Sequence, residues 1–203
     1  MKLNILTPLI LILAPIILSA CQNKTVSVPS DNNYVVLDKD PNTSDQVQSS
    51  PLTQASENQY VAINTDYGQI VVELFSKIAP NTVKNFLDKV NSNYYDGLIF
   101  HRVVPNFVVQ GGDPTGTGTG GGKINSELNQ IPFKTGSLGL ARTPDTKEVS
   151  NDSQFFICLS DLQCGPLTGD YVNFGQVVSG MDTVAQIKIG DIINSIVTTT
   201  KWR

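Results

Sequence analysis

The sequence predicts a mainly β fold, a closed antiparallel barrel with helical caps. Two observations predict it. Short runs rich in Val, Ile, Phe and Tyr recur through residues 59–203, and Gly, Pro, Asn or Asp separate them, as is typical of strands joined by turns. Only two segments carry a helical pattern. Many short strands with few helices favour a barrel, in which every strand has two neighbours.

The first elements expected are a β-hairpin and a helix. Residues 59–64 (QYVAIN) and 68–75 (GQIVVELF) are β-rich, and the TDYG between them supplies the polar residues and glycine of a tight turn. Pro80 suits the first turn of a helix, apolar residues then repeat at helical spacing from Val83 to Val90, and Gly97 lies beyond its end.

Strands make up most of the remaining domain. Residues 98–104 (LIFHRVV) and 107–112 (FVVQGG) read as a pair that turns at Pro-Asn. A second, short helix is expected over residues 181–189 (MDTVAQIKI). The other β-like runs are GSLGLAR (136–142), SQFFICL (153–159), YVNFGQVV (171–178) and INSIVTTTKW (193–202).

The first twenty residues have the layout of a secretory signal. A lysine near the start is followed by an apolar run and then by small residues before Cys21. Pro8, Pro15 and the shortness of the run argue against a membrane-spanning helix. LSAC (18–21) resembles the bacterial lipobox, so we expect residues 1–20 to be a lipoprotein signal peptide and Cys21 to carry lipid. The alternatives are an ordinary signal and an uncleaved anchor.

Residues 21–58 are expected to form a flexible, lipid-anchored linker. Ser, Thr, Asn, Asp, Gln and Pro dominate this segment, which cannot bury enough apolar surface to offset its ordering entropy. The folded domain would then be held at the cell envelope by a lipid anchor. In bacterial sorting, the residue after the lipid-bearing cysteine influences which membrane receives the lipoprotein. Gln22, which is not an aspartate, points by this analogy to the periplasmic side of an outer membrane.

Composition excludes some partners. The formal net charge of −4 offers no basic surface for nucleic acid, so we expect none to bind. One histidine, and no CxxC spacing among the three cysteines, do not make a metal site. We expect a monomer that carries no metal.

Two cysteines remain beyond Cys21. Cys158 lies within QFFICL, and Cys164 follows six residues later. In an oxidising compartment the two can form a disulfide. The alternative, which we favour, is that Cys158 is a buried thiol and Cys164 a loop residue.

The glycine-rich stretch from Gly111 to Gly122 raises the question of nucleotide binding. Gly116, Gly118 and Gly121 satisfy G-x-G-x-x-G, but no helix follows to hold a pyrophosphate. The P-loop pattern fails as well, because Lys123 is followed by isoleucine. We expect a wide loop that turns at positive φ.

His101 and Arg102 are the remaining candidates for chemistry. A hydrolase that pairs His101 with Ser153 or Ser160 is disfavoured, because no nucleophile elbow is present. Strand alternation places His101 opposite Arg102, and we expect the histidine to be a hydrogen-bonded structural residue. Arg102 would share a face with Phe100, and an arginine in an apolar run has a task or a partner. The structural alternative is a salt bridge to a carboxylate such as Asp113 or Glu127.

Five stretches together resemble the cyclophilin family of peptidyl-prolyl cis–trans isomerases. They are FHRVVPNFVVQGGD, GTGGGK, LGLAR, NDSQFFICL and LTGDYVNFGQVV, which occur in this order between residues 100 and 178, and the resemblance runs from about residue 59 to the C-terminus. The resemblance implies a cyclophilin-type domain over residues 59–203 and an eight-stranded antiparallel barrel closed by two helices. It also implies an outer groove that binds proline-containing segments, and isomerisation of Xaa–Pro bonds without a cofactor.

The resemblance assigns site residues position by position. Arg102 matches the catalytic arginine, and Gln110 and Phe107 complete the catalytic set. The positions that match substrate-binding residues are Phe107, Val108, Gln110, Ala141, Arg142, Gln154, Phe156, Leu167 and Tyr171. Three residues depart from the best-known eukaryotic members: Val108 replaces methionine, Tyr171 replaces histidine, and Pro166 replaces a tryptophan, which puts tight cyclosporin binding in doubt.

Two rival interpretations remain at the level of sequence. A binding module would hold proline-containing segments without accelerating their isomerisation, and Arg102 would then only pair with a carboxylate. An inert structural lipoprotein would leave the groove residues unexplained. The favoured interpretation is an isomerase that assists the folding of exported proteins.

Overall fold

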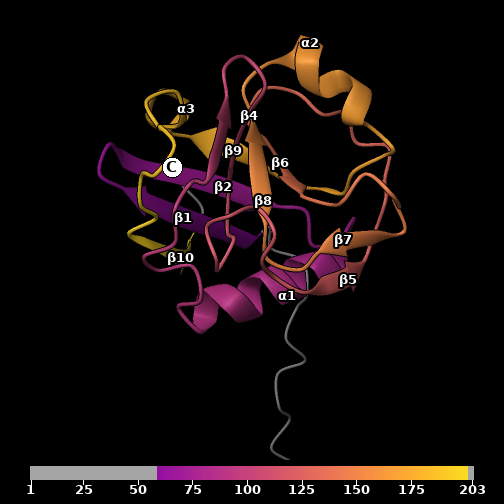
Figure 1. Ribbon diagram of the computed structural model, residues 1–203, viewed down its shortest axis with the longest axis horizontal. Coiled ribbons are helices and arrows are strands. Elements are labelled where there is room, and N and C mark those ends of the chain that lie inside the picture. The colour runs from indigo at the N-terminus through magenta and orange to yellow at the C-terminus, as the bar shows by residue number, and fades with distance from the viewer. Residues whose placement is uncertain (1–58, 201–203) are drawn as a thin grey trace, which may run out of the picture. The chain divides into compact units, whose positions relative to one another are not determined.

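A computed structural model describes residues 59–200 (Figure 1). The predicted signal peptide (1–20) and the whole of the predicted linker (21–58) lie outside these residues. The elements in chain order are β1 (Gln59–Thr65), β2 (Gly68–Leu74), α1 (Pro80–Asn91), β3 (Arg102–Val104), β4 (Val108–Gly111), β5 (Lys123–Asn125), β6 (Ser137–Leu140), β7 (Val149–Asn151), β8 (Phe155–Cys158), α2 (Asp161–Cys164), the 3-10 helix η1 (Gly165–Leu167), β9 (Asn173–Ser179), α3 (Met181–Val184) and β10 (Ser195–Thr199).

The described strands form one large and one small antiparallel sheet. The large sheet has eight strands in the order β10-β1-β2-β9-β6-β8-β4-β3, and β5 pairs with β7 in the small one. The predicted hairpin at the start of the domain is confirmed, since β1 and β2 pair from Gln59↔Leu74 to Thr65↔Gly68. In Figure 1, α1 lies at one end of the large sheet, and α2 and α3 lie at the other.

The sheet is an open half-barrel, so the expected closed barrel is wrong. Its edge strands β3 and β10 do not pair with each other within the described chain. The segments that precede them meet at a single bridge, Ile99↔Ile192, with the Ile193 N–H donating to the Leu98 carbonyl at 2.8 Å. β3 is only three residues long, and Pro105 follows it, so the edge is too short to build a ladder.

Of the two expected helices, the first is confirmed and the second is shorter than predicted. The apolar stripe predicted in α1 is buried at Val83, Phe86 and Val90. The second helix is the single turn α3, because the chain bends again where the Lys188 N–H donates to the Asp191 carboxylate at 2.6 Å. The sequence did not predict α2, η1, β5 or β7.

Two apolar clusters stabilise the described domain. The larger fills the inside of the half-barrel and includes Phe86, Phe100, Phe155 and Phe174. The smaller lies on the other side of β4 and β8 and consists of Val108, Phe133, Phe156, Cys158 and Cys164. Burying side chains of this size contributes roughly 1.5–3 kcal/mol each.

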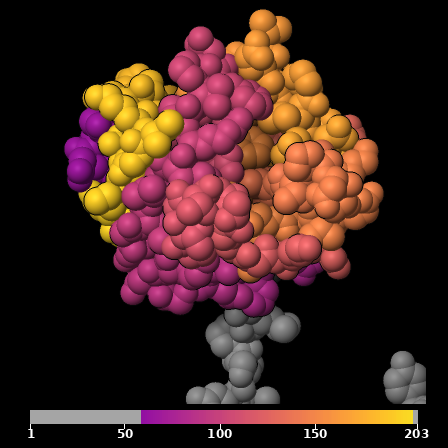
Figure 2. All heavy atoms as spheres, in the orientation of Figure 1, coloured from indigo at the N-terminus to yellow at the C-terminus, as the bar shows by residue number. Residues whose placement is uncertain are grey.

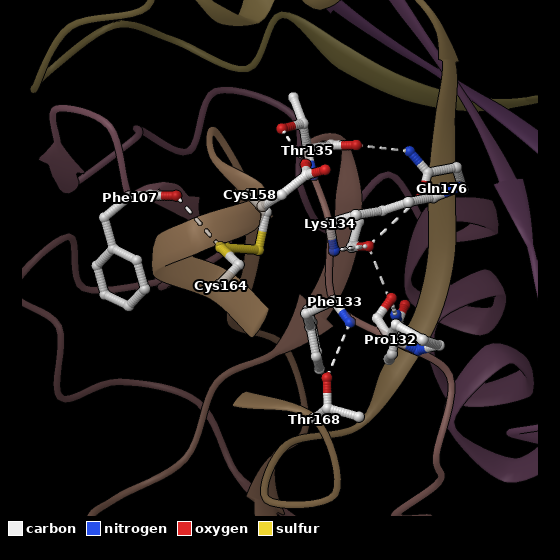
Figure 3. Close-up of a disulfide and its surroundings, with 12 residues drawn as sticks. Phe107, Pro132, Phe133, Lys134, Thr135, Cys158, Cys164, Thr168 and Gln176 are labelled. Atoms are coloured by element: carbon white, nitrogen blue, oxygen red, sulfur yellow. Dashed lines mark hydrogen bonds between the residues drawn. A yellow bond between two sulfur atoms is a disulfide. The ribbon is translucent and has the colours of Figure 1, made fainter. Parts of the chain in front are cut away.

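Cys158 and Cys164 form a disulfide, with Cα atoms 6.2 Å apart (Figure 3). The favoured expectation of a free buried thiol and a loop cysteine is therefore wrong. Cys164 ends the unpredicted helix α2, and this turn brings its side chain back to the end of β8. Both residues are completely buried.

Candidate active site

Nine residues line a pocket of about 260 Å³ on the outer face of the sheet. They are Arg102, Phe107, Val108, Gln110, Ala141, Arg142, Phe156, Leu167 and Tyr171. Figure 2 shows this face, with a hollow between the atoms of the β3–β4 region and those of the later segments. Every residue predicted for the site except Gln154 lines this pocket.

The β3–β4 hairpin provides one side of the pocket. Arg102 pairs directly with Gln110, and Val104 pairs with Val108. Asn106 adopts a positive φ of 59° in the turn, a conformation that asparagine tolerates better than most residues. The Phe107 N–H closes the turn by donating to the Val104 carbonyl at 3.0 Å. Short-range pairing therefore fixes the spacing of the arginine and the glutamine.

Arg102 is an exposed cation held by a neutral partner. Its Nη1 donates to Gln110 Oε1 at 3.2 Å, and its guanidinium carbon lies 5.7 Å from the centre of the Phe107 ring. Among residues 59–200, no carboxylate forms an ion pair with it. The guanidinium is thus aimed into the pocket with donor capacity to spare.

The carboxylates considered as structural partners of Arg102 are engaged elsewhere. Asp113 accepts hydrogen bonds from the backbone and hydroxyl of Thr115, at 2.8 and 2.9 Å. Glu127 accepts the Thr82 N–H at 2.7 Å, at the start of α1. The salt-bridge interpretation of Arg102 is therefore wrong for this structure.

The expectation that Phe100 and Arg102 share a face is also wrong. Phe100 is completely buried in the larger cluster, whereas Arg102 is exposed. Regular strand conformation begins only at Arg102, so alternation does not extend back to Phe100. The arginine lies on the outer face of the sheet, as the family resemblance implied for the groove.

A chain of amide hydrogen bonds supports Gln110 from behind. Its Nε2 donates to Gln154 Oε1 at 3.0 Å, and Gln154 Nε2 donates to the Gly120 carbonyl at 2.8 Å. Asn151 Oδ1 in turn accepts the Gln154 N–H at 2.8 Å. Gln154 is almost completely buried, so this chain holds the amide of Gln110 in one orientation.

Gln154 lines a neighbouring pocket of about 220 Å³. That second pocket shares Gln110, Ala141 and Arg142 with the first, so the two are continuous at this side. The structure therefore brings all of the predicted groove residues into one connected surface.

The apolar wall of the first pocket comes from rings that support one another. Phe133 stacks on Phe156 with centroids 5.6 Å apart, and Tyr171 meets Phe156 edge-on at 5.8 Å. Leu167, at the end of η1, packs against the same cluster. Such an arrangement suits a small apolar ring, because its walls are fixed before a ligand enters.

Arg142 has a different environment from Arg102. Its Nε donates to the Asp170 carbonyl at 2.9 Å, and its Nη1 donates to the carbonyls of Thr143 and Thr146 at 2.9 and 3.1 Å. Its guanidinium carbon lies 4.4 Å from the centre of the Tyr171 ring. Arg142 thus fixes a loop and a wall and has less freedom to meet a ligand.

The glycine-rich stretch forms the wide loop that was expected. Gly116, Gly118 and Gly121 have φ of 67°, 88° and 89°. The Asp113 carboxylate stabilises the loop by accepting hydrogen bonds from the Thr115 N–H and the Gly118 N–H. Burial would raise the pKa of Asp113, but the hydrogen bonds that it accepts from the loop outweigh burial and lower that pKa.

His101 does not make the hydrogen bonds that were expected of it. Neither ring nitrogen has a partner of normal geometry, and both are buried. Burial lowers the pKa of His101, and the charge of Arg102 adds to the lowering. The Asp113 carboxylate and the Gln154 side chain oppose it. The imidazole ring is therefore uncharged at neutral pH, and it lies against the glycine-rich loop at Gly118.

Three supporting residues were missed at the level of sequence. Phe133 lies behind Phe156, and Asn151 and Gly120 hold Gln154. Asn151 belongs to the NDSQFFICL stretch, so the motif contained it without revealing its task. Gly120 likewise belongs to the GTGGGK stretch, which did not reveal its contact with Gln154. Phe133 carried no local signal, because its contact with Phe156 is with a residue more than 20 positions away. Within the described residues, no three His, Cys, Asp or Glu side chains gather to hold a metal ion.

Residues 60–201 match the family model described as cyclophilin type peptidyl-prolyl cis-trans isomerase/CLD. A peptidyl-prolyl cis-trans isomerase of Helicobacter pylori is 42% identical over 151 residues, which are 71% of this chain and 89% of that protein. One from Schizosaccharomyces pombe is 43% identical over 126 residues, 60% of this chain and 79% of that protein.

Solved structures give the same result. A cyclophilin type peptidyl-prolyl cis-trans isomerase of Cryptosporidium parvum superposes with a TM-score of 0.66 at 35% identity. The match covers 71% of this chain and 99% of that one. A second crystal structure of the same protein, in the presence of the dipeptide Ala-Pro, gives a TM-score of 0.64 and covers 70% of this chain and 100% of that one.

Proposed function

The chain belongs to the cyclophilin-type peptidyl-prolyl cis–trans isomerases, and on this premise we propose that the pocket beside Arg102 is its active site. The reaction is rotation about an Xaa–Pro peptide bond. Resonance gives that bond partial double-bond character and a barrier near 20 kcal/mol. The rotation needs no nucleophile, because no covalent bond is made or broken.

Arg102 would stabilise the twisted transition state. As the amide turns out of plane, the prolyl nitrogen loses conjugation and regains a lone pair. A guanidinium directed at that nitrogen makes a hydrogen bond that the planar ground state does not offer, which is the differential binding that catalysis requires. Arginine remains protonated throughout the working pH range.

The other pocket residues would hold the substrate on either side of the rotating bond. Phe107, Phe156 and Leu167 provide an apolar recess for the proline ring. Gln110, fixed by Gln154, can hold the substrate backbone. With one side held, the other is free to turn, so geometry supplies part of the rate acceleration. The Ala-Pro dipeptide present in the crystal of the Cryptosporidium parvum relative supports a proline-containing ligand here.

The observation that carries this assignment is the unpaired guanidinium at the pocket. Arg142 is engaged by three backbone carbonyls, whereas Arg102 donates to the neutral Gln110, lies beside the Phe107 ring and has no paired carboxylate among the described residues. Hydrogen bonds to charged groups contribute about 1.5–3 kcal/mol, which corresponds to roughly 10- to 150-fold in rate.

The test is prolyl isomerisation of a short Ala–Pro peptide by the full chain and by Arg102→Ala. We expect the variant to lose about one to two powers of ten in kcat/KM while its far-UV spectrum is unchanged. Lys84→Ala is the matched control, because Lys84 is an exposed cation on α1, away from the pocket. Equal rates for wild type and Arg102→Ala would make the arginine structural. Peptide binding without acceleration would make the domain a binding module.

We further propose that the enzyme is a lipid-anchored monomer of the cell envelope, attached through Cys21, and that it acts on exported proteins. The lipobox-like LSAC supports the anchor. The disulfide supports an oxidising compartment, since such bonds are rare in the cytosol. No helix within residues 59–200 is long and apolar enough to cross a membrane. If the cell has an outer membrane, its periplasmic side is the expected location.

Labelling with a radioactive fatty acid tests the anchor. The wild type should take up label and sediment with membranes, and Cys21→Ala should do neither. Unlabelled wild type in the cytosol would remove the proposal. The role with exported proteins is tested in cells that lack the protein, where unchanged folding and abundance of every exported protein would contradict it.

A further inference from the structure

We infer that the Cys158–Cys164 disulfide positions the wall of the proline pocket, so that affinity for substrate depends on its oxidation. This inference rests on the proposed assignment of the pocket as the active site. The disulfide is not one of the pocket's lining residues, and it lies directly behind them.

The disulfide and the pocket share one apolar cluster. Cys158 and Cys164 are core members of the smaller cluster together with Val108, Phe133 and Phe156. Phe107, Leu167 and Tyr171 pack against this cluster. Five residues thus belong both to the cluster and to the pocket lining: Phe107, Val108, Phe156, Leu167 and Tyr171. Breaking the disulfide should therefore alter the packing of the apolar residues that line the pocket.

One end of the disulfide is rigid. Cys158 ends β8 and pairs with Val108 of β4. Its carbonyl also accepts the Gly136 N–H at 2.8 Å. Hydrogen bonds on both sides fix this cysteine to the central sheet.

The other end lies on a segment with little support of its own. Cys164 is the last residue of α2, a helix of four residues, and η1 follows at once. A helix this short is not stable alone in water. Asp161 anchors its start by accepting the Thr135 N–H at 2.7 Å, while Leu162 beside it is 81% exposed. The disulfide is the covalent tie between this segment and the sheet.

The segment carries a pocket residue immediately beyond the tie. Leu167 is the last residue of η1, three positions after Cys164. Between the two residues, the Gly165 N–H donates to the Asp161 carbonyl and the Gly165 carbonyl accepts the Thr168 N–H at 3.1 Å, so these backbone bonds are made within the segment and not to the sheet. Release of Cys164 therefore removes the covalent restraint nearest to Leu167 and loosens its placement against the pocket.

The disulfide also touches the hairpin side of the pocket. Cys164 Sγ lies 3.4 Å from the Phe107 carbonyl oxygen, as the dashed line in Figure 3 marks. A disulfide sulfur carries no proton, so in the oxidised protein this is a packing contact. The Phe107 carbonyl already accepts the Leu159 N–H at 2.7 Å. Oxidation thus holds the chain at Phe107 and the chain at Leu167 at a fixed separation.

The polar catalytic pair, Arg102 and Gln110, does not depend on this tie. Arg102 is placed by its pairing with Gln110, and Gln110 is placed by Gln154. None of the three belongs to the smaller cluster. Reduction should therefore weaken binding of the proline ring and leave the catalytic step nearly intact.

The reduction is an ordinary thiol–disulfide exchange with a dithiol. A thiolate of the reductant attacks one protein sulfur, the protein S–S bond breaks, and a mixed disulfide forms. The second thiol of the reductant displaces the protein sulfur and closes a cyclic disulfide. The protein gains two electrons and two protons as two thiols, and the dithiol is oxidised. Because both sulfurs are buried, the exchange requires the α2–η1 segment to open.

The experiment compares the oxidised full chain with the same protein treated with dithiothreitol. Thiol titration must show two more thiols after treatment. We expect KM for an Ala–Pro peptide, and its Kd by calorimetry, to rise about 3- to 10-fold on reduction, with kcat within about twofold. Removal of the dithiol and reoxidation should restore the original affinity.

Two variants keep the test decisive. Cys164→Ala lacks the disulfide and should have the raised KM from the start, with no further change in dithiothreitol. Leu162→Ala alters an exposed side chain on α2 and should behave as wild type in both states. If the reduced wild type unfolds, Cys158→Ala with Cys164→Ala, which removes both thiols, gives the same comparison by circular dichroism and KM.

Several results would overturn the inference. They are equal KM and Kd in the oxidised and the fully reduced protein, no gain of thiols on treatment, and a fall in kcat with KM unchanged. Failure of the proposed active site gives a different result, since Arg102→Ala would then keep its rate in the oxidised protein. The two proposals are thus separately testable.

Discussion

Arg102 and Gln110 face each other across the β3–β4 hairpin, with the guanidinium donating to the amide oxygen at 3.2 Å. The two are a directly paired couple of a short antiparallel ladder. Their separation is set by register and needs no distant contact to establish it. The same amide donates to Gln154 with its nitrogen, so each end of the Gln110 amide has one partner and keeps a second hydrogen-bonding position for substrate.

Replacing Gln110 should reduce catalysis through orientation. Gln110→Ala removes the acceptor that holds the guanidinium and the group proposed to hold substrate backbone. One such hydrogen bond is worth about 1–2 kcal/mol, so we expect kcat/KM to fall roughly 5- to 30-fold. Peptide isomerisation measured by NMR exchange gives the value. Gln186→Ala, on the exposed surface after α3, is a matched control, and an unaltered rate in Gln110→Ala would contradict the role.

The glycine at position 139 should be essential for the shape of the pocket. A Cβ at Gly139 would lie 2.2 Å from Phe156 Cζ and within 2.7 Å of two other ring atoms. Gly139→Ala must therefore displace the ring that forms the pocket wall. Overpacking of this kind costs about 1–3 kcal/mol of stability. We expect KM for the Ala–Pro peptide to rise as well.

Gly165→Ala is the control for this substitution. Its added methyl group meets nothing within 4 Å, and its φ of −48° suits any residue. Its free energy of unfolding should stay within about 0.5 kcal/mol of wild type. Denaturant titration and peptide kinetics on both variants give the comparison. A Gly139→Ala protein with wild-type stability and KM would show that Phe156 moves without consequence.

The parts of the fold that sequence predicted are those fixed by neighbours along the chain. The β1–β2 and β3–β4 hairpins follow from turn residues between apolar runs, and α1 follows from its apolar stripe. β5 and β7 were missed because each has three residues and finds its partner about 25 positions away. The open edge was missed because closure requires β3 to pair with β10, a strand about 90 residues later, and β3 is too short to do so.

The same division applies to the site. The family resemblance predicted that Arg102, Gln110 and the apolar lining residues share one groove, and they line one pocket in the structure. Their catalytic roles remain predictions. Periodicity misplaced Phe100, because strand alternation was extended into a segment that is not a strand. Composition could not decide the pairing of Cys158 with Cys164, since that depends on a turn of helix between them.

Glu127 should stabilise α1 from a distant loop. The helix has no side-chain cap of its own at Ala79, and Glu127 accepts the N–H groups of Asn81 and Thr82 at 3.1 and 2.7 Å. Loss of such a cap costs about 1–2 kcal/mol, so Glu127→Ala should lower Tm by about 2–8 °C. Calorimetry checks this. Kinetics should be unchanged, because α1 does not line the pocket.

The control is Asp88→Ala, which removes an exposed ion pair with Lys84 on the same helix. Such pairs contribute little, so its Tm should stay close to wild type. Burial would raise the pKa of Glu127, but hydrogen bonds from Thr82 and Asn81 outweigh it and lower that pKa. The carboxylate's contribution is therefore present above about pH 4.5 and is lost as pH falls further. Equal Tm values for Glu127→Ala and wild type at neutral pH would contradict the cap.

His101 should make the domain less stable in mild acid. Burial lowers its pKa from the ordinary 6.5, so the folded state favours the neutral ring. The stability that this provides is complete above pH 6.5 and is lost as pH falls from there towards the folded pKa. Because it is the single histidine of the chain, one NMR signal reports its titration. We expect a midpoint below 6.5 and a free energy of unfolding that falls as pH drops below 6.5, while His101→Asn has a flatter profile. A midpoint at or above 6.5 would mean that the ring is solvated and that its neutral form is not part of the folded core.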